Sequence, residues 1–326
     1  MKGRIAVTGF RVGELLEQPN LGSVSCEVGL NGVVGKGLID ARVDGSVSQL
    51  EFNGYDYDSL RFGGRRTEKT FNGHVRADDP ALRFDFQGEV GFNPERPHYD
   101  FDLDLIHADL ARMHLNRRDS VSVLSALVEA RASGRTLDDL NGKVTVGDVV
   151  YRYNADTLRT TRLTLDGQNS AGSKYLSLQS EFADATFRSR TDYKTVFEYL
   201  RSSLEKYIPL LYDERKARKR AAGAVSVVDD YSVLSVDVKH FTPVADAVAD
   251  GLQIADGSQL RLLFNPANDK LSLKATSEYI ERERMLATRL NLNATNRGDS
   301  LSVYLRSEDF YVGTFHMPQL SVMGGA

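Results

Sequence analysis

Alternation of apolar and polar residues is the dominant pattern along this chain. In the segment from Leu140 to Phe187, four short runs alternate in this way; Leu163 and Leu165, for example, flank Thr164. Asn-Gly, Asp-Gly and Ala-Gly pairs separate the runs and supply the positive φ that tight hairpin turns require. Because successive side chains of a strand point to opposite faces, the pattern predicts strands with one apolar and one polar face.

The same pattern continues through most of the remaining sequence. Residues 1–100 contain short alternating runs whose turn signals recur about every 8 to 12 residues, the spacing of sheets built from hairpins. The segments YLSLQSEFADATF at 175–187 and SVYLRSEDFYVGTF at 302–315 resemble each other, which indicates a repeated strand unit. These features predict an all-β, mainly antiparallel fold with an elongated sheet. One-sided alternation fits a closed sandwich as well as an open trough.

One strong amphipathic helix is predicted from Asp192 to about Gly223, with apolar residues at i, i+3, i+4 and i+7. Asp192 suits the N-cap position, and Pro209 predicts a kink or an end near Tyr207. Such a stripe favours a helix that packs against or plugs the sheet; a helix lying on a membrane is the alternative. The predicted apolar face of the helix consists of Tyr193, Val196, Phe197, Leu200, Leu204, Ile208 and Leu211.

A basic run ends this predicted helix and has three interpretations. Cations at a helix C-terminus complement the negative end of the helix dipole, which is the simplest interpretation. Contact with anionic lipid headgroups comes second. Nucleic acid comes last, because no aromatic stacking platform accompanies the run. The candidate headgroup contacts are Arg215, Lys216, Arg218, Lys219 and Arg220.

Length and charge narrow the class of protein. A chain of 326 residues can bury a sizeable core in one large or two smaller β domains. We expect a first sheet segment at 1–190, the helix at 191–223, and a second sheet segment at 224–326.

The formal net charge of -4 argues against nucleic acid as a partner, because phosphate-binding surfaces are usually strongly basic. The single cysteine, Cys26, cannot form an internal disulfide and suits a small buried thiol in a strand.

The two ends of the chain resemble strands rather than targeting signals. MKGRIAVTGF lacks the apolar core of a signal peptide, and no stretch approaches the roughly 20 apolar residues of a membrane span. HMPQLSVMGGA stops just after a strand pattern. We therefore expect the chain to be a segment of a longer protein.

The sequence contains little that points to catalysis. There is no GxGxxG opening a helix, no GxxxxGK[ST] loop and no GxSxG elbow. His107 and His114 are seven positions apart, whereas metal-binding pairs on a helix usually lie four apart. We therefore expect no enzyme activity, no metal and no cofactor.

Several segments resemble a known family. They include LDDLNGKVTV, the strand of Asp156, Leu158, Leu163 and Leu165, the segment YLSLQSEFADATF and the helix end KYIPLLY. VDGSVSQLEFNGYDYDSLRFGG, followed by FNGHVRADDPALRFDFQGEV, is similar to repeated strand-and-turn units of the same family. Together they resemble the TamB branch of the AsmA-like envelope proteins of Gram-negative bacteria. The N-terminal membrane helix and the C-terminal domain of full-length members are missing, so the resemblance implies an internal segment.

The resemblance implies a β-taco, which is a long antiparallel sheet curled into a U with an apolar concave face. It further implies a periplasmic protein, anchored in the inner membrane outside this segment, that carries phospholipid acyl chains between the two membranes. A link to an outer-membrane barrel assembly protein is also implied. No catalytic residues belong to the family. The alternative is a structural or adhesive β-rich module with a closed core and no lipid.

If the trough exists, the alternating positions of the central and C-terminal strands should line it. The predicted lining residues are Leu163, Leu165, Leu176, Leu178, Leu271, Leu273, Leu290, Leu292, Leu301, Val303 and Leu305.

Overall fold

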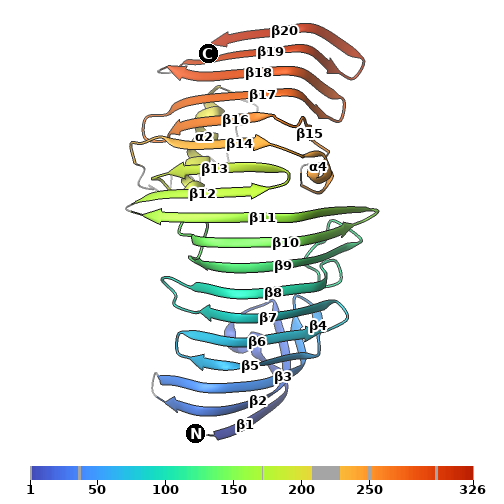
Figure 1. Cartoon of the computed structure of the whole chain (residues 1–326), viewed down its shortest axis with the longest axis vertical. Coiled ribbons are helices and arrows are strands. Elements are labelled where there is room, and N and C mark those ends of the chain that lie inside the picture. The colour runs from blue at the N-terminus through green and yellow to red at the C-terminus, as the bar shows by residue number, and fades with distance from the viewer. Residues whose placement is uncertain are drawn as a thin grey trace. The chain divides into compact units, whose positions relative to one another are not determined.

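The computed structural model describes residues 2–35, 38–170, 172–207, 228–248, 251–297 and 300–325. In these ranges strands dominate, helices are few, and the paired strands are antiparallel (Figure 1). The all-β, mainly antiparallel fold class predicted from alternation is therefore confirmed.

The chain divides into two compact units. Unit 1 comprises Met1–Arg135 and Gly142–Leu163, and unit 2 comprises Thr136–Asn141 and Thr164–Ala326. The division passes through strand β11 (Asp156–Ser170). The sheet segments expected at 1–190 and 224–326 stay a prediction.

Unit 1 is an antiparallel meander in which most strands pair with their neighbours in sequence. The pairs are β1–β2, β2–β3, β3–β5, β5–β6, β6–β7, β7–β8 and β8–β9, and the short β4 also pairs with β3. The elements are β1 (Lys2–Arg11), α1 (Val12–Leu16), β2 (Leu21–Gly35), β3 (Leu38–Phe52), β4 (Tyr55–Tyr57), β5 (Leu60–Thr67), β6 (Thr70–Asp78), β7 (Leu82–Gly91), β8 (His98–Asp109), β9 (Ser122–Ser133) and β10 (Asn141–Tyr153).

In its described residues, unit 2 follows the same plan and also contains helices α2 and α4. The antiparallel pairs are β12–β13, β13–β14, β14–β16, β16–β17, β17–β18, β18–β19 and β19–β20, while the short β15 pairs with β17. The elements are β12 (Ser173–Ser180), β13 (Ala183–Ser189), α2 (Tyr193–Tyr207), β14 (Ser232–Val238), α4 (Thr242–Val248), β15 (Gln253–Ile254), β16 (Gln259–Asn265), β17 (Lys270–Arg282), β18 (Met285–Arg297), β19 (Ser300–Val312) and β20 (Phe315–Gly325).

The two similar Ser-Glu segments of the sequence occupy different places in the fold. Ser180 ends β12, and its Oγ donates to the carbonyl oxygen of Ala183 at the start of β13, at 2.8 Å. Ser307 lies within β19 and is fully buried, and its Oγ donates to the carbonyl oxygen of Asp309, also at 2.8 Å. In both places the hydroxyl donates to a backbone carbonyl oxygen where strand pairing is interrupted, so the shared serine has a similar local role in the two segments.

Glycines face each other across three strands of unit 1. Gly64 is opposite Gly73, and Gly73 is opposite Gly88. A Cβ at Gly73 would lie 2.6 Å from the Gly64 Cα, and one at Gly88 would lie 2.4 Å from the Cα of Phe101. Real Cβ atoms do not come so close, so these positions require glycine for the strands to approach as they do.

Replacing Gly73 should therefore destabilise unit 1. We expect Gly73→Ala to lower the free energy of unfolding by about 1–3 kcal/mol, because the methyl group forces the two strands apart. The matched control is Gly3→Ala in β1, whose added Cβ would meet nothing within 4 Å. Urea unfolding followed by circular dichroism checks this; an equal loss in the two variants would contradict the close approach.

Candidate functional site

Strand register in unit 2 gathers apolar side chains on one face of the sheet. Residues directly opposite each other in an antiparallel pair point to the same face, as do residues two apart in one strand. Three rows result. Row A consists of Leu176, Phe187, Leu234, Leu262, Leu273, Ala294 and Val303. Row B consists of Leu178, Ala185, Val236, Leu260, Ala275, Leu292, Leu305 and Val322. Row C consists of Phe264, Leu271 and Leu301; Phe264 faces Leu271, whereas Leu301 faces Asn296 of β18.

The opposite face of the same strands is mainly polar, although Val233 and Leu263 face each other on it. One chain of directly paired residues crosses β12, β13, β14, β16, β17 and β18 without an apolar member. It consists of Ser177, Thr186, Ser235, Arg261, Lys274 and Asn293. The one-sided alternation predicted from sequence is thus maintained across the pairings.

The predicted lining residues of β12, β17, β18 and β19 all lie on the apolar face. Eight of them belong to rows A to C, and Leu290, which is opposite Ser277, lies two residues before Leu292 on the same side of β18. Leu163 and Leu165 are half-buried in β11, with Leu163 in unit 1 and Leu165 in unit 2. The eight are Leu176, Leu178, Leu271, Leu273, Leu292, Leu301, Val303 and Leu305.

Sequence analysis missed the contributions of β14 and β16 to this face. Leu234, Val236, Leu260 and Leu262 occupy rows A and B. Their signal was present in SVLSVDV and QLRLLF, where apolar residues recur at every second position.

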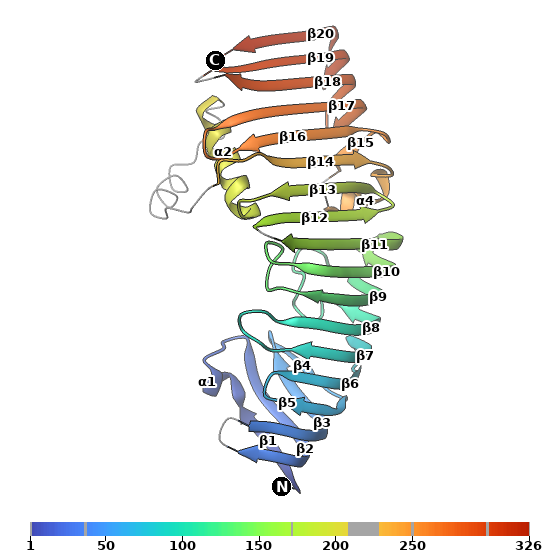
Figure 2. The same ribbon diagram turned by 60° about the vertical axis from the view of Figure 1, so that its left-hand side comes forward.

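Helix α2 lies beside the strands of unit 2 (Figure 2), and its side chains pack against rows A and C. Tyr193 and Val196 are buried in the cluster formed with these rows, and Leu200 packs against it. These three residues recur at i, i+3 and i+7, so they form one stripe of the helix. The helix therefore lies on the apolar side of the unit 2 sheet.

The remaining residues of the predicted helix face have other positions. Phe197 is 46% exposed, although its ring centroid lies 5.4 Å from that of Phe187, because it flanks the buried stripe. Leu204 belongs to α2. The other predicted positions lie outside the described residues: Ile208, Leu211, Arg215, Lys216, Arg218, Lys219 and Arg220.

Row B remains accessible beside the helix. In rows A and C, Phe187, Leu262 and Leu271 are each less than 9% exposed. No member of row B is buried to this degree, and Val322 at its end is 43% exposed, although Leu260 also packs against the cluster under the helix. The apolar face of unit 2 thus has a part that is buried under α2 and, beside it, a row that is mostly half-buried.

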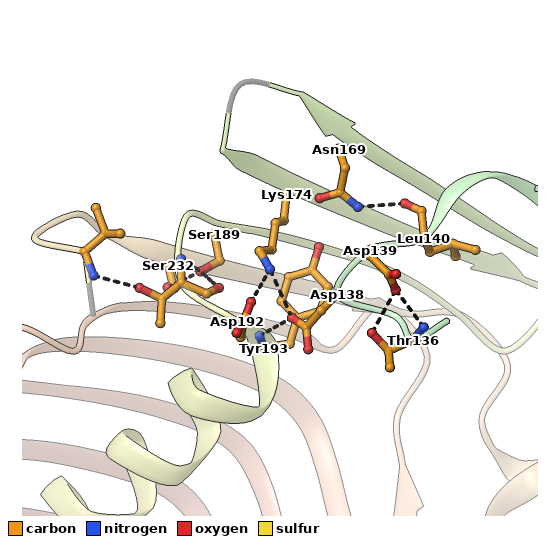
Figure 3. A network of polar contacts seen from close by, with 12 residues as sticks. Thr136, Asp138, Asp139, Leu140, Asn169, Lys174, Ser189, Asp192, Tyr193 and Ser232 are labelled. Atoms are coloured by element: carbon orange, nitrogen blue, oxygen red, sulfur yellow. Dashed lines mark hydrogen bonds and ion pairs between the residues drawn. The ribbon is translucent and has the colours of Figure 1, made fainter. Parts of the chain in front are cut away.

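A polar network holds the N-terminus of α2 (Figure 3). The Tyr193 backbone N–H donates to Asp138 Oδ1 at 2.6 Å, so the carboxylate at the first helical amide comes from a distant loop. Lys174 of β12 bonds to Asp192 and lies 3.7 Å from Asp138. A negative charge at a helix N-terminus is favourable. Asp192 occupies the predicted N-cap position, since its carbonyl oxygen accepts a hydrogen bond from the Val196 N–H at 2.9 Å, but its side chain bonds to Lys174.

Two buried hydroxyls weaken the contact between α2 and the sheet. Tyr193 Oη and Ser203 Oγ have no hydrogen-bond partner among the described residues. Each such group costs about 1–3 kcal/mol, which is comparable to the gain of about 1.5–3 kcal/mol from burying a valine or leucine side chain. Burial also raises the pKa of the Tyr193 phenol to about 12, with a further contribution from Asp138.

Unit 1 carries an apolar face of the same design. One row of directly paired residues crosses five strands and consists of Phe62, Val75, Phe86, Leu103 and Val128. All five are half-buried. At one end of this face, Met113 and Tyr57 close a buried cluster with Leu60 and Leu105.

The described part of the chain contains no cluster of metal-ligating residues and no helix that could span a membrane. No group of three or more His, Cys, Asp or Glu residues there could hold a metal ion. No helix there is both long and apolar enough to cross a membrane. His107 lies in β8, and His114 Nδ1 lies 3.1 Å from the carbonyl oxygen of Asn53.

No family model, curated protein or solved structure matches this chain. A functional proposal therefore depends on the apolar faces themselves and on the resemblance noted in the sequence.

The packing of α2 gives a direct stability prediction. We expect Val196→Ala to lower the free energy of unfolding by about 1–3 kcal/mol, because Val196 is only 1% exposed and its removal leaves a cavity. The control is Lys194→Ala on the exposed side of α2, for which a change below about 0.5 kcal/mol is expected. Denaturant titration of both variants measures this, and an unchanged Val196→Ala midpoint would show that the helix does not pack as described.

Proposed function

We propose that this chain binds phospholipid acyl chains along its apolar faces, as part of a TamB-like periplasmic bridge between the inner and outer membranes. The observation that carries the proposal is row B, an accessible apolar row that crosses strands β12 to β20. The resemblance adds a membrane anchor outside this segment and a role in outer-membrane assembly with a barrel assembly protein. The proposal requires no catalytic residue.

The length of row B suits an acyl chain. Its seven inter-strand spacings of about 4.8 Å give a length of roughly 34 Å. In a bilayer two opposed acyl chains fill a hydrocarbon core of roughly 30 Å, so one chain spans about 15 Å and fits within row B. Burying a CH₂ group gains about 0.8 kcal/mol, so a 16-carbon chain gains on the order of 10 kcal/mol before ordering costs.

Such a row also suits movement. Its members are aliphatic and share no specific polar group, so a chain could slide along it with little change in free energy. The charged headgroup would stay in water, outside the row.

One observation favours the alternative, a structural or adhesive module with a closed core. Helix α2 already fills the space over rows A and C with its own side chains. The two functions differ in what occupies row B: lipid in the first, and water or a protein partner in the second.

Phospholipid should accompany the protein through purification. We expect native mass spectrometry, after expression in a Gram-negative periplasm, to show the chain carrying phospholipid, and organic extraction to recover that lipid. A protein that is consistently free of phospholipid in both measurements would contradict the proposal.

A charge within row B should block binding. We expect Leu292→Arg to weaken phospholipid binding roughly a hundredfold, because a charge placed against hydrocarbon costs about 2.5–3.5 kcal/mol. Leu178→Asp in the same row should act in the same direction. The control is Asn291→Arg, an adjacent and exposed position on the polar face. Circular dichroism confirms that the variants fold; equal lipid binding by Leu292→Arg and the control would refute row B as the site.

A further inference from the structure

Helix α2 covers part of the surface that the proposed function assigns to lipid. The three rows share one face of the same strands, and row A lies between row B and row C. An acyl chain in row B therefore borders the edge of the helix. We propose, on the basis of the proposed function, that α2 is a displaceable cover. Acyl chains compete with the helix for rows A and C, and bound lipid moves the helix away from the sheet.

The surface beneath α2 is well suited to hydrocarbon. Phe187, Leu262, Phe264, Leu271 and Leu301 form it, and each is less than 9% exposed with the helix in place. An acyl chain in place of the helix would keep these side chains away from water. The exchange leaves the sheet itself unchanged.

While α2 lies on the sheet, in contrast, two of its polar groups form no hydrogen bond with the described residues. Tyr193 Oη and Ser203 Oγ are buried without a hydrogen-bond partner among the residues that the structure describes. Leaving the sheet would return both hydroxyls to water, where they can be hydrogen-bonded. Acyl chains have no such groups, so the exchange favours lipid at these two positions.

Part of the aromatic surface of the helix remains exposed. Phe197 is 46% exposed and Tyr199 is 36% exposed. Aromatic side chains beside a polar face are typical of helices that lie at the boundary between lipid and water. A displaced α2 could thus remain in contact with the bound lipid.

Contacts at the N-terminus of α2 set how readily it leaves. Asp138 accepts a hydrogen bond from the Tyr193 backbone N–H, and Lys174 bonds to Asp192. The Lys174 side chain is only 17% exposed and that of Asp138 is 25% exposed, so water screens their contact less than it would on the surface. Weakening these contacts should favour the displaced helix and so tighten lipid binding, because a ligand gains affinity when its competent state is more populated.

The experiment uses one lipid probe and two readouts. The probe is a lysophospholipid with a single brominated 18-carbon chain, kept below its micelle concentration. The first readout is quenching of a tryptophan at Leu292→Trp, which is a single reporter because the chain contains no Trp. The second is backbone hydrogen exchange in Tyr193–Ser203 of the unmodified protein.

The expected result is quenching in row B together with roughly tenfold faster exchange in α2 when the probe is saturating. Quenching with unchanged or slower exchange in α2 would overturn the cover, while the proposed function would stand. The absence of quenching would overturn the proposed function, and the cover with it.

A variant of the N-terminal contacts provides an independent check. We expect Asp138→Ala to speed exchange in α2 without lipid and to lower the Kd for the probe at least about threefold. The control is Asp237→Ala, an exposed carboxylate on the polar face, which should change neither quantity. Faster exchange without tighter binding would overturn the competition between helix and lipid.

Discussion

The pairing register of antiparallel strands is the constraint on which the remaining structure depends. A shift of one residue in any pair would move every leucine of that strand to the polar face. From β12 to β19 the register pairs Leu, Val, Ala and Phe with one another in rows A and B, while the paired polar residues from Ser177 to Asn293 cross the opposite face. The register and the burial of apolar area therefore support each other.

Small residues and polar contacts adapt this sheet locally. The facing pair Gly64 and Gly73 lets two strands of unit 1 approach more closely than any side chain would permit. The Ser307 hydroxyl donates a hydrogen bond to the carbonyl oxygen of Asp309, where strand pairing in β19 is interrupted. In unit 2, Asp138 and Lys174 secure one end of a helix that would otherwise depend on a short stripe of apolar contacts. Each device serves the same end, which is to keep one apolar face intact.

Much of this architecture could be predicted from sequence because strand alternation is a local property. Leu176, Leu178, Leu271 and Leu273 could be assigned to one face from their own neighbours alone. The position of α2 could not, since its periodicity shows that it has an apolar stripe but not which surface receives it. Asp138 was also missed as the partner of the helix N-terminus, because the two are far apart in sequence and only the fold brings them together.

The central claim is that row B is an apolar surface open to an acyl chain. The most direct measurement is photo-crosslinking with a phospholipid that carries a diazirine in its acyl chain, followed by mass-spectrometric mapping of the adducts. The account predicts adducts at row B positions such as Leu178, Leu292 and Leu305, with none on the polar face at Ser177 or Asn293. Adducts confined to the polar face, or no adducts at all on the folded protein, would contradict it.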